Sequence, residues 1–487
     1  WAAFILVMLL LGGYGLYTLR LNVSSEKPRA IDGYEIWDAD IVESARDISL
    51  QDGGRIKPFS TWSGFTMLKL HGARGMRIEA NGEVAKISPE EFMLDCLFRP
   101  QLARELPIFR IDNSEVISSL ATGDLPEEVQ RLSGIDNASK NEAIRKVVKD
   151  KGRRDRYSYA ELESIAPILL ARVQKIRKDQ PEKAKMTSEQ RDTVDLGEKI
   201  WMFTALIYHM DFARADIEVQ EGTPAMDKER MRRMSYWVRS FPLLRKAVLE
   251  MKPQGEKLPA GIMSLFSDLE RRMIRASEDI RLLPPYADDS EEWLPVGKRI
   301  EAVLTGKRNH AEALVADMET MEEMCIALRD EGQGAFGKQL NAWKKSVHDR
   351  MDPKTVNQLG SEVAYGKWNY FYRALVIFII GFLFVMISWL APRSRGGRFC
   401  NKIVGLLALT ALGLMIVGIT HRSIIMERSP IGNLYDTILF IGATGVLVLL
   451  LVELLTKRAV ALGLAVFMGM ACMFLARRYE IGDAKDH

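Results

Sequence analysis

Three side chains able to bind a metal or an anion lie close together near the end of the chain. His421, Arg422 and Arg428 occupy a short polar connection between two apolar runs. An imidazole can ligate iron, and a guanidinium binds a carboxylate as a two-pronged donor. Tyr435 follows at the start of the second run, where its ring can stack or form a hydrogen bond. Taken alone, these residue types are compatible with binding a metal ion or an anion.

The connection that carries these side chains also has the composition of a shaped turn. Residues 428–436 read Arg-Ser-Pro-Ile-Gly-Asn-Leu-Tyr-Asp. Pro430, Gly432 and Asn433 favour a turn, and Asp436 is placed to cap the helix that follows. The alternative to ligand binding is therefore a structural turn, with the histidine and the arginines as ordinary residues at a membrane interface.

A second turn is predicted near the start of the chain, at residues 51–58. Its turn-forming and basic residues are Asp52, Gly53, Gly54, Arg55, Lys57 and Pro58. Adjacent glycines make positive φ available, and Pro58 fixes the exit from the turn. We expect a tight turn that displays the basic side chains of Arg55 and Lys57.

Four apolar runs must position the first group of residues. They cover 371–390, 403–419, 434–455 and 459–475. Each is close to the ~20 residues that cross a hydrocarbon core as a helix, so a four-helix transmembrane unit is predicted over 370–478. A fifth run predicts an N-terminal transmembrane helix at 1–19. It has no small-residue cleavage site, which favours an uncleaved anchor over a signal peptide.

Basic residues predict how these helices are oriented. The links at 392–398 and 457–458 are rich in Lys and Arg, which is typical of cytoplasmic loops. Alternation across the membrane then places 420–432, the tail at 479–487 and all of 20–369 on the outer side. Arginines within 420–432 weaken this rule slightly and suggest an anionic partner there.

The large segment between the first and second apolar runs reads mainly as helices. Capping boxes begin at Ser88 and Ser158. Longer helices are expected from 187, over 262–283 and over 310–351. Glycines interrupt residues 31–87, so that stretch is expected to be loops with a short strand pair. The sequence thus predicts a mainly α, multi-pass helical membrane protein with a large, mostly helical extracytoplasmic domain.

Charge, cysteines and histidines exclude several classes of protein. The 67 basic and 64 acidic residues are interspersed, with a net charge of +3, so no nucleic-acid partner is indicated. The four cysteines form no CxxC or CxxCH pattern, which argues against a c-type cytochrome or a zinc module. Cys96 and Cys325 lie where a disulfide is allowed, but two buried thiols are favoured. His209 flanks an apolar stripe and is expected to be a packed or surface histidine.

Two motifs resemble the CcsA/ResC family of cytochrome c assembly proteins. Residues 428–436, followed by 437–441, are similar to that family's Pro-x-Ser/Thr/Gly-Asn-x-Tyr-Glu/Asp turn before a membrane helix. Residues 51–58 resemble a Gln-Asp-Gly-Arg-Ile-Lys-Pro segment of its fused members. Residues 365–374, at the entry to the first span of the C-terminal group, also fit the family's pattern. The order of these motifs and their placement relative to the spans make the match specific, while the rest of 20–369 matches loosely.

The resemblance implies a function in cytochrome c biogenesis. Such proteins transport or hold haem b at the outer face of the bacterial inner (cytoplasmic) membrane, where it is attached covalently to apocytochrome c. This places 20–369 on the periplasmic side and makes the chain a candidate part of a cytochrome c haem lyase (synthase). The implied partners are haem, apocytochrome c, a CcsB/ResB-type subunit or fused half, and the lipid bilayer. The implied haem contacts are His421 on the iron, with Arg422, Arg428 and Tyr435.

The sequence departs from that family in two places. The histidine that many members place before the turn is Arg428 here, and the Trp-rich segment that holds haem is absent, since the tryptophans end at Trp389. We therefore expect a part of a longer protein rather than a divergent member, with haem bound partly outside it. The alternative is a non-catalytic, membrane-anchored scaffold of a respiratory or assembly complex. A transporter is disfavoured because the spans hold no charge pair.

Overall fold

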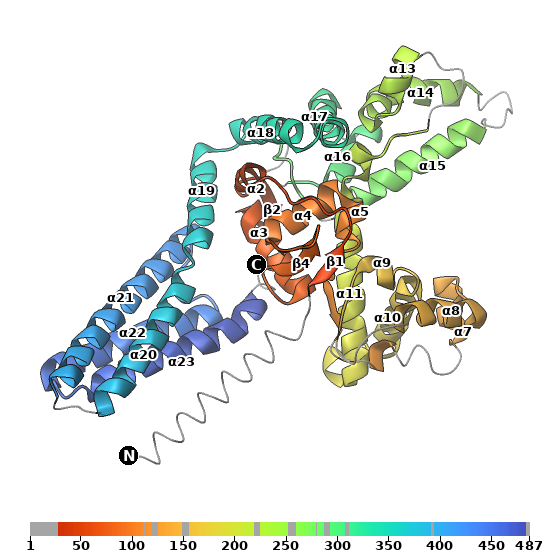
Figure 1. Cartoon of the computed structure of the whole chain (residues 1–487). Helices are drawn as coiled ribbons and strands as arrows, with labels where there is room; N and C mark the ends of the chain where they lie inside the picture. Colours follow the sequence, from red (N-terminus) through yellow and green to blue (C-terminus); the bar gives the residue numbers. More distant parts are fainter. Residues whose placement is uncertain are drawn as a thin grey trace. The chain divides into compact units, whose positions relative to one another are not determined.

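Most of the chain is helical, which confirms the predicted fold class at this level (Figure 1). The computed structural model describes residues 28–111, 113, 115–117, 125–148, 155–218, 225–251, 260–278, 280–286, 293–306, 311–390 and 394–483. Two compact units can be distinguished. The first comprises Trp1–Trp37 and Leu70–Trp201, and the second Asp38–Lys69 and Met202–His487. The predicted transmembrane helix at 1–19 lies outside the described residues, as do residues 484–487 of the predicted tail.

The first unit combines two small sheets with short helices. One sheet has the order β1-β4-β5, with β1 parallel to β4 and a β4–β5 hairpin that turns at Asn81 and Gly82. β6 and β7 form an antiparallel pair. The strands are β1 (Arg29–Ile31), β4 (Met76–Ala80), β5 (Glu83–Ile87), β6 (Phe109–Ile111) and β7 (Asp155–Tyr157). The helices are α4 (Pro89–Phe98), α5 (Pro100–Ala103), α7 (Glu127–Ser133), α8 (Asn137–Val148), α9 (Tyr159–Leu162), α10 (Ala166–Asp179), the 3₁₀ turn η1 (Lys183–Lys185) and α11 (Ser188–His209), whose residues from Met202 on belong to the second unit. The predicted capping boxes at Ser88 and Ser158 are both confirmed.

A buried carboxylate organises the middle of the first unit. Asp95 on α4 is fully buried and accepts hydrogen bonds from Tyr34 Oη at 2.6 Å and Trp37 Nε1 at 2.8 Å. Arg99, one turn later, donates from Nε at 2.8 Å and stacks 3.9 Å from the Trp37 ring centroid. The segment before α2 is therefore fixed to α4 by polar contacts that water does not reach.

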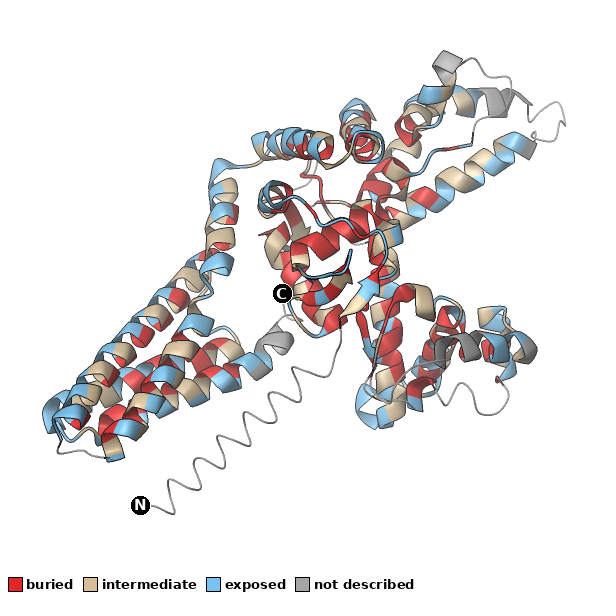
Figure 2. Cartoon of the chain, in the orientation of Figure 1, coloured by how far each residue is buried: buried red, intermediate tan, exposed pale blue. Residues whose placement is uncertain are grey.

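The second unit contains a hairpin and a series of helices before its membrane segment. These are α2 (Ala39–Ala45), β2 (Ser49–Asp52), β3 (Arg55–Pro58), α3 (Phe59–His71), α12 (Asp211–Arg214), α13 (Ala225–Met231), α14 (Met234–Met251), α15 (Ala260–Arg275), α16 (Val296–Leu304), α17 (Ala311–Asp330), α18 (Gln333–Asp349) and α19 (Pro353–Trp368). In Figure 2, buried residues are frequent on α3 and α17, whereas α15 and α19 carry mostly intermediate and exposed residues.

Three expectations about these elements were wrong. Residues 31–87 are not mainly loops, because α2, α3 and the four strands β2–β5 lie within them. The helix expected over 262–283 ends at Arg275. The helix expected over 310–351 is two helices, since Gly332 has a φ of +89°, which a continuing helix does not allow. The long helix expected from 187 is confirmed as α11.

Four apolar helices, each long enough to cross a membrane, form the C-terminal part of the second unit. They are α20 (Tyr370–Leu390), α21 (Arg395–Ile425), α22 (Leu434–Thr456) and α23 (Val460–Asp483), and they lie side by side as a bundle (Figure 1). Glycines allow close approach in this bundle: a Cβ on Gly469 would lie 2.5 Å from the Phe378 ring. α23 extends to Asp483, so residues 479–483 of the predicted tail are helical.

The two cysteines outside the apolar helices are free and buried. Cys96 lies in the first unit and Cys325 in the second. Burial raises the pKa of the Cys325 thiol to about 12, so it stays protonated and unreactive near neutral pH. The expectation of two buried thiols is confirmed.

His209, at the end of α11, is buried without a hydrogen bond at either ring nitrogen within the described part of the chain. Burial, assisted by Arg214, lowers its pKa to about 3, whereas an unfolded histidine titrates near ~6.5. Between these two pH values the unfolded state binds the extra proton, so stability falls as the pH drops through this window.

Replacing His209 with leucine is therefore expected to stabilise the protein. The substitution removes two buried ring nitrogens that have no hydrogen-bond partner among the described residues. The free energy of unfolding should therefore rise by about 1 kcal/mol near pH 7, and this increase should grow as the pH falls from 6.5 towards 3. Thermal unfolding of the full chain in detergent at several pH values measures this. His71 is the matched control, because its Nδ1 lies 2.8 Å from Arg156 Nη1 and His71→Leu should destabilise. A lower melting temperature for His209→Leu at pH 7 would contradict the argument.

Candidate functional site

The connection between α21 and α22 is set by the ends of these two helices. α21 continues to Ile425, so His421 and Arg422 lie near its C-terminal end rather than in the polar connection expected from the sequence. Asn433 is the N-cap of α22, and its side-chain oxygen accepts from Asp436 N at 2.8 Å. The expectation that Asp436 caps this helix was wrong, because Asn433 already performs that role.

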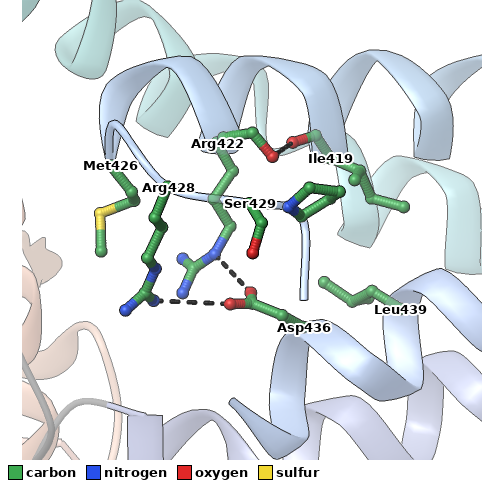
Figure 3. A pocket seen from close by; sticks show the side chains of 9 residues that line it. Ile419, Arg422, Met426, Arg428, Ser429, Asp436 and Leu439 are labelled. Atoms are coloured by element: carbon green, nitrogen blue, oxygen red, sulfur yellow. Dashed lines mark hydrogen bonds and ion pairs between the residues drawn. The ribbon is translucent and has the colours of Figure 1, made fainter. Parts of the chain in front are cut away.

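Asp436 instead holds the two arginines of the connection (Figure 3). Its carboxylate is buried and accepts from Arg422 Nε at 2.8 Å and from Arg428 Nη2 at 3.4 Å. The Arg422 guanidinium lies 5.2 Å from the Tyr435 ring centroid. The structure thus brings together three of the four predicted ligand-binding residues, around an internal anion. An external carboxylate would have to compete with Asp436 for these arginines.

The turn residues make this arrangement possible. A Cβ on Gly432 would lie 3.0 Å from Arg428 Nε, so glycine lets the guanidinium pass close to the backbone. Pro430 lines a hollow beside Asp436 with a volume of about 10 Å³, near the ~10–15 Å³ that one water molecule requires. A large ligand at this connection must therefore lie on the surface.

His421 has a different set of partners. Its Nε2 lies 2.8 Å from Ser361 Oγ on α19. Its ring meets Tyr365 and Tyr370 edge to face, with ring centroids 5.4 and 6.0 Å apart. The imidazole therefore faces the end of α19 and the start of α20, whereas Arg422 faces Asp436. Among the described residues, no group of three or more His, Cys, Asp or Glu side chains could hold a metal ion.

The glycine-rich motif at residues 51–58 forms the β2–β3 hairpin. Asp52 pairs with Arg55, and both intervening glycines have positive φ, +60° at Gly53 and +77° at Gly54, which is the geometry of a type I′ turn. The predicted tight turn is confirmed. Pro58 ends β3, and α3 follows directly.

The basic side chains of this hairpin are not displayed, contrary to expectation. Lys57 is 2 % exposed, and its Nζ lies 2.6 Å from Asp52 Oδ2. Arg55 forms a two-pronged pair with Glu362 on α19, at 2.6 and 3.0 Å. Buried basic groups need such partners, and the partner of Arg55 is 307 positions away in the sequence.

Helix α19 contacts the first motif and the residues just before the second. Glu362 binds the hairpin and the adjacent Ser361 binds His421. One and two turns earlier, Gln358 and Lys354 contact the Glu427 carboxylate at 2.8 and 3.1 Å. Sequence reasoning missed these residues. Positions 354, 358 and 362 have the spacing of a single helical face, but nothing in the sequence identifies what that face contacts.

Comparisons with known proteins add no identification. No family model matches this sequence, and no curated protein is significantly similar to it. What the structure establishes is a membrane-type helical bundle whose α21–α22 connection is linked through α19 to the β2–β3 hairpin.

Proposed function

We propose that this chain is a membrane component of cytochrome c assembly that handles haem at the outer face of the bacterial cytoplasmic membrane. The haem would be passed on for covalent attachment to apocytochrome c. The observation that carries the proposal is that consecutive residues of α19 hold the first motif and the helix end that leads into the second. Residues 51–58 contact Glu362, and the end of α21, just before residues 428–436, contacts Ser361.

This linkage supports the proposal because it joins two parts of the chain that resemble the same family. They lie far apart in the sequence, and neither predicts a contact with the other. A chance resemblance in two turns gives no reason for one helix, which leads into α20, to hold both the first turn and the helix end before the second. A shared site at the membrane end of α19 does give such a reason.

Haem in this proposal is cargo rather than a resident group. His421 would offer an imidazole to the iron, and Arg422 or Arg428 would exchange Asp436 for a propionate. The fit is partial, because His421 Nε2 is engaged by Ser361 and both arginines are engaged by Asp436. The small hollow at the connection favours a surface position for the cargo. A CcsB/ResB-type subunit and apocytochrome c are the proposed partners.

An absorption spectrum of the full-length protein tests the proposal. Purified in detergent and reduced with dithionite, it should show a haem Soret band that weakens or shifts in His421→Ala. His348→Ala is the matched control, since His348 Nε2 binds the Asp47 carbonyl oxygen at 3.1 Å in the soluble part. A band unchanged by His421→Ala would keep haem handling and move the ligand elsewhere. No haem in a well-folded preparation would contradict the proposal.

A membrane-anchored scaffold is the second candidate function. Contacts of α18 with the segment before β3 need no ligand: Gln333 accepts from Asp38 N at 2.8 Å, and Lys344 pairs with Asp47 at 2.8 Å. If the chain stabilises an assembly, its complexes should persist in haem-deficient cells. Loss of those complexes without haem would instead favour haem handling.

A further inference from the structure

An exposed aromatic surface lies where α19 gives way to α20. The Trp368 indole stacks on the Tyr370 ring, with centroids 6.1 Å apart and planes within 8° of parallel. The Arg373 guanidinium lies 4.9 Å from the Trp368 ring centroid. We call these three side chains the ledge. Trp368 remains 51 % exposed and Arg373 is exposed, so flat apolar surface and a cation are presented together.

The backbone explains why these side chains are exposed. Asn369 has a φ of +45° and ends α19, and asparagine is among the few residues that adopt this conformation readily. The break turns the chain between Trp368 and Tyr370, so their side chains flank the junction. Gly418 on α21 permits the close approach here, because a Cβ would lie 3.1 Å from Tyr370 Cβ.

The ledge adjoins the predicted iron ligand. The Tyr370 ring meets the His421 ring edge to face, with centroids 6.0 Å apart. An unbroken row of rings therefore runs from Trp368 through Tyr370 to the imidazole. Interfacial tryptophans and arginines commonly serve as membrane anchors, but anchoring gives no reason for a stack that continues to a histidine.

Arg373 differs from the arginines of the connection in its partners. Arg422 and Arg428 are both held by Asp436. In the parts of the chain that the structure describes, no carboxylate lies within ion-pair distance of Arg373, whose neighbour is the Trp368 ring. A guanidinium placed against an aromatic face keeps its donors directed outward, so Arg373 can bind a ligand carboxylate without breaking an existing ion pair.

We infer that the ledge binds the porphyrin ring of haem, with Trp368 against the macrocycle and Arg373 on a propionate, beside His421. A flat aromatic ligand with carboxylates at its edge complements both features of the ledge. The inference rests on the proposed function and deepens it. It assigns the first anion contact to Arg373, which lies outside residues 51–58 and 428–436.

Iron-free porphyrin separates the ledge from ligation of iron. The haem-free, full-length protein in nanodiscs of zwitterionic lipid is titrated with mesoporphyrin IX and with its dimethyl ester, followed by porphyrin fluorescence anisotropy. Arg373→Gln should weaken binding of the diacid about tenfold, the loss expected for one charge-assisted hydrogen bond, and should leave binding of the ester unchanged. Trp368→Leu should weaken binding of both ligands. Arg395→Gln, an exposed arginine at the start of α21, is the control and should change neither.

The outcomes distinguish this inference from the function on which it rests. If the wild-type protein binds neither haem nor mesoporphyrin, the proposed function fails. If the wild-type protein binds both and Arg373→Gln and Trp368→Leu bind equally well, the ledge is an interfacial anchor and the inference is overturned while the function stands. Equal weakening of diacid and ester by Arg373→Gln would also overturn the assigned carboxylate contact. Each variant changes an exposed side chain and is compared by its circular dichroism spectrum.

Discussion

Asp95→Ala is expected to lower the free energy of unfolding of the first unit by about 3–5 kcal/mol, the usual cost of removing one partner from a buried ion pair. The substitution leaves the nearly buried Arg99 without the carboxylate that it contacts at 2.6 Å. It also removes the acceptor of the Tyr34 hydroxyl and the Trp37 indole. No other interaction described in the first unit joins so many buried polar groups at one side chain.

The effect of Asp95 also depends on pH. Burial raises the pKa of its carboxyl to about 6, against the opposing influence of Arg99 and the donors, while an unfolded aspartate titrates near ~3.9. The folded state therefore holds more protons between these values, so this residue's contribution to stability falls as the pH rises from about 4 to about 6. Asp95→Ala should remove this dependence.

Hydrogen exchange in α4 and thermal unfolding of the full chain measure both effects. Glu83→Ala is the matched control, because Glu83 is an exposed acid in the same unit, and it should change stability little. Asp95→Asn should lie between wild type and Asp95→Ala, since an amide keeps one acceptor oxygen. A loss for Asp95→Ala no larger than that for Glu83→Ala would mean that the network does not stabilise the unit.

Features determined by neighbouring residues could be predicted from the sequence. The capping boxes at Ser88 and Ser158 involve residues three positions apart, and two adjacent glycines between paired strands define the hairpin turn. The four apolar helices follow from run length alone. In each case the physical cause lies within one segment of the chain.

Features determined by distant partners could not be predicted. Helix α3 shows little apolar periodicity, since much of its surface is buried, and a helix buried all round has no stripe to detect. Arg55 reads as a displayed cation because its partner lies 307 positions away. At the candidate site, the side-chain chemistry of His421 and Arg422 suggested that both residues contact the same ligand. Adjacent positions on a helix point about 100° apart, and here they meet different partners.

The pair Arg55–Glu362 should show a coupling free energy of about 2 kcal/mol, typical of a two-pronged, partly buried contact between charged groups. Glu362 is 7 % exposed, and the pair joins the β2–β3 hairpin to α19. Either Arg55→Ala or Glu362→Ala should therefore destabilise the hairpin, while the double variant should cost less than the sum of the two. Hydrogen exchange of the β2–β3 amides in the full-length protein measures this coupling.

Two controls make this cycle informative. Lys178 and Glu128 form an exposed ion pair at 2.7 Å, and the same cycle there should give no measurable coupling because water screens both charges. Exchanging the charges, as Arg55→Glu with Glu362→Arg, should recover part of the lost protection. If the effects of the two single substitutions simply add in the Arg55–Glu362 cycle, as they should in the Lys178–Glu128 cycle, the assigned contact is contradicted.

The effect of the Arg55–Glu362 pair on haem binding tells whether the pair only stabilises the fold or also supports a site shared by the two motifs. Glu362 is adjacent to Ser361, which holds His421 Nε2, so releasing the hairpin should also loosen the position of the imidazole. Under the proposed function, Glu362→Ala should weaken or shift the haem Soret band in a protein whose α20–α23 bundle still resists exchange, and the charge-exchanged variant should restore it. A variant whose β2–β3 amides lose protection from hydrogen exchange, but whose haem absorption spectrum matches the wild type, would show that α19 stabilises the two motifs separately. The linkage through α19 would then no longer support haem handling.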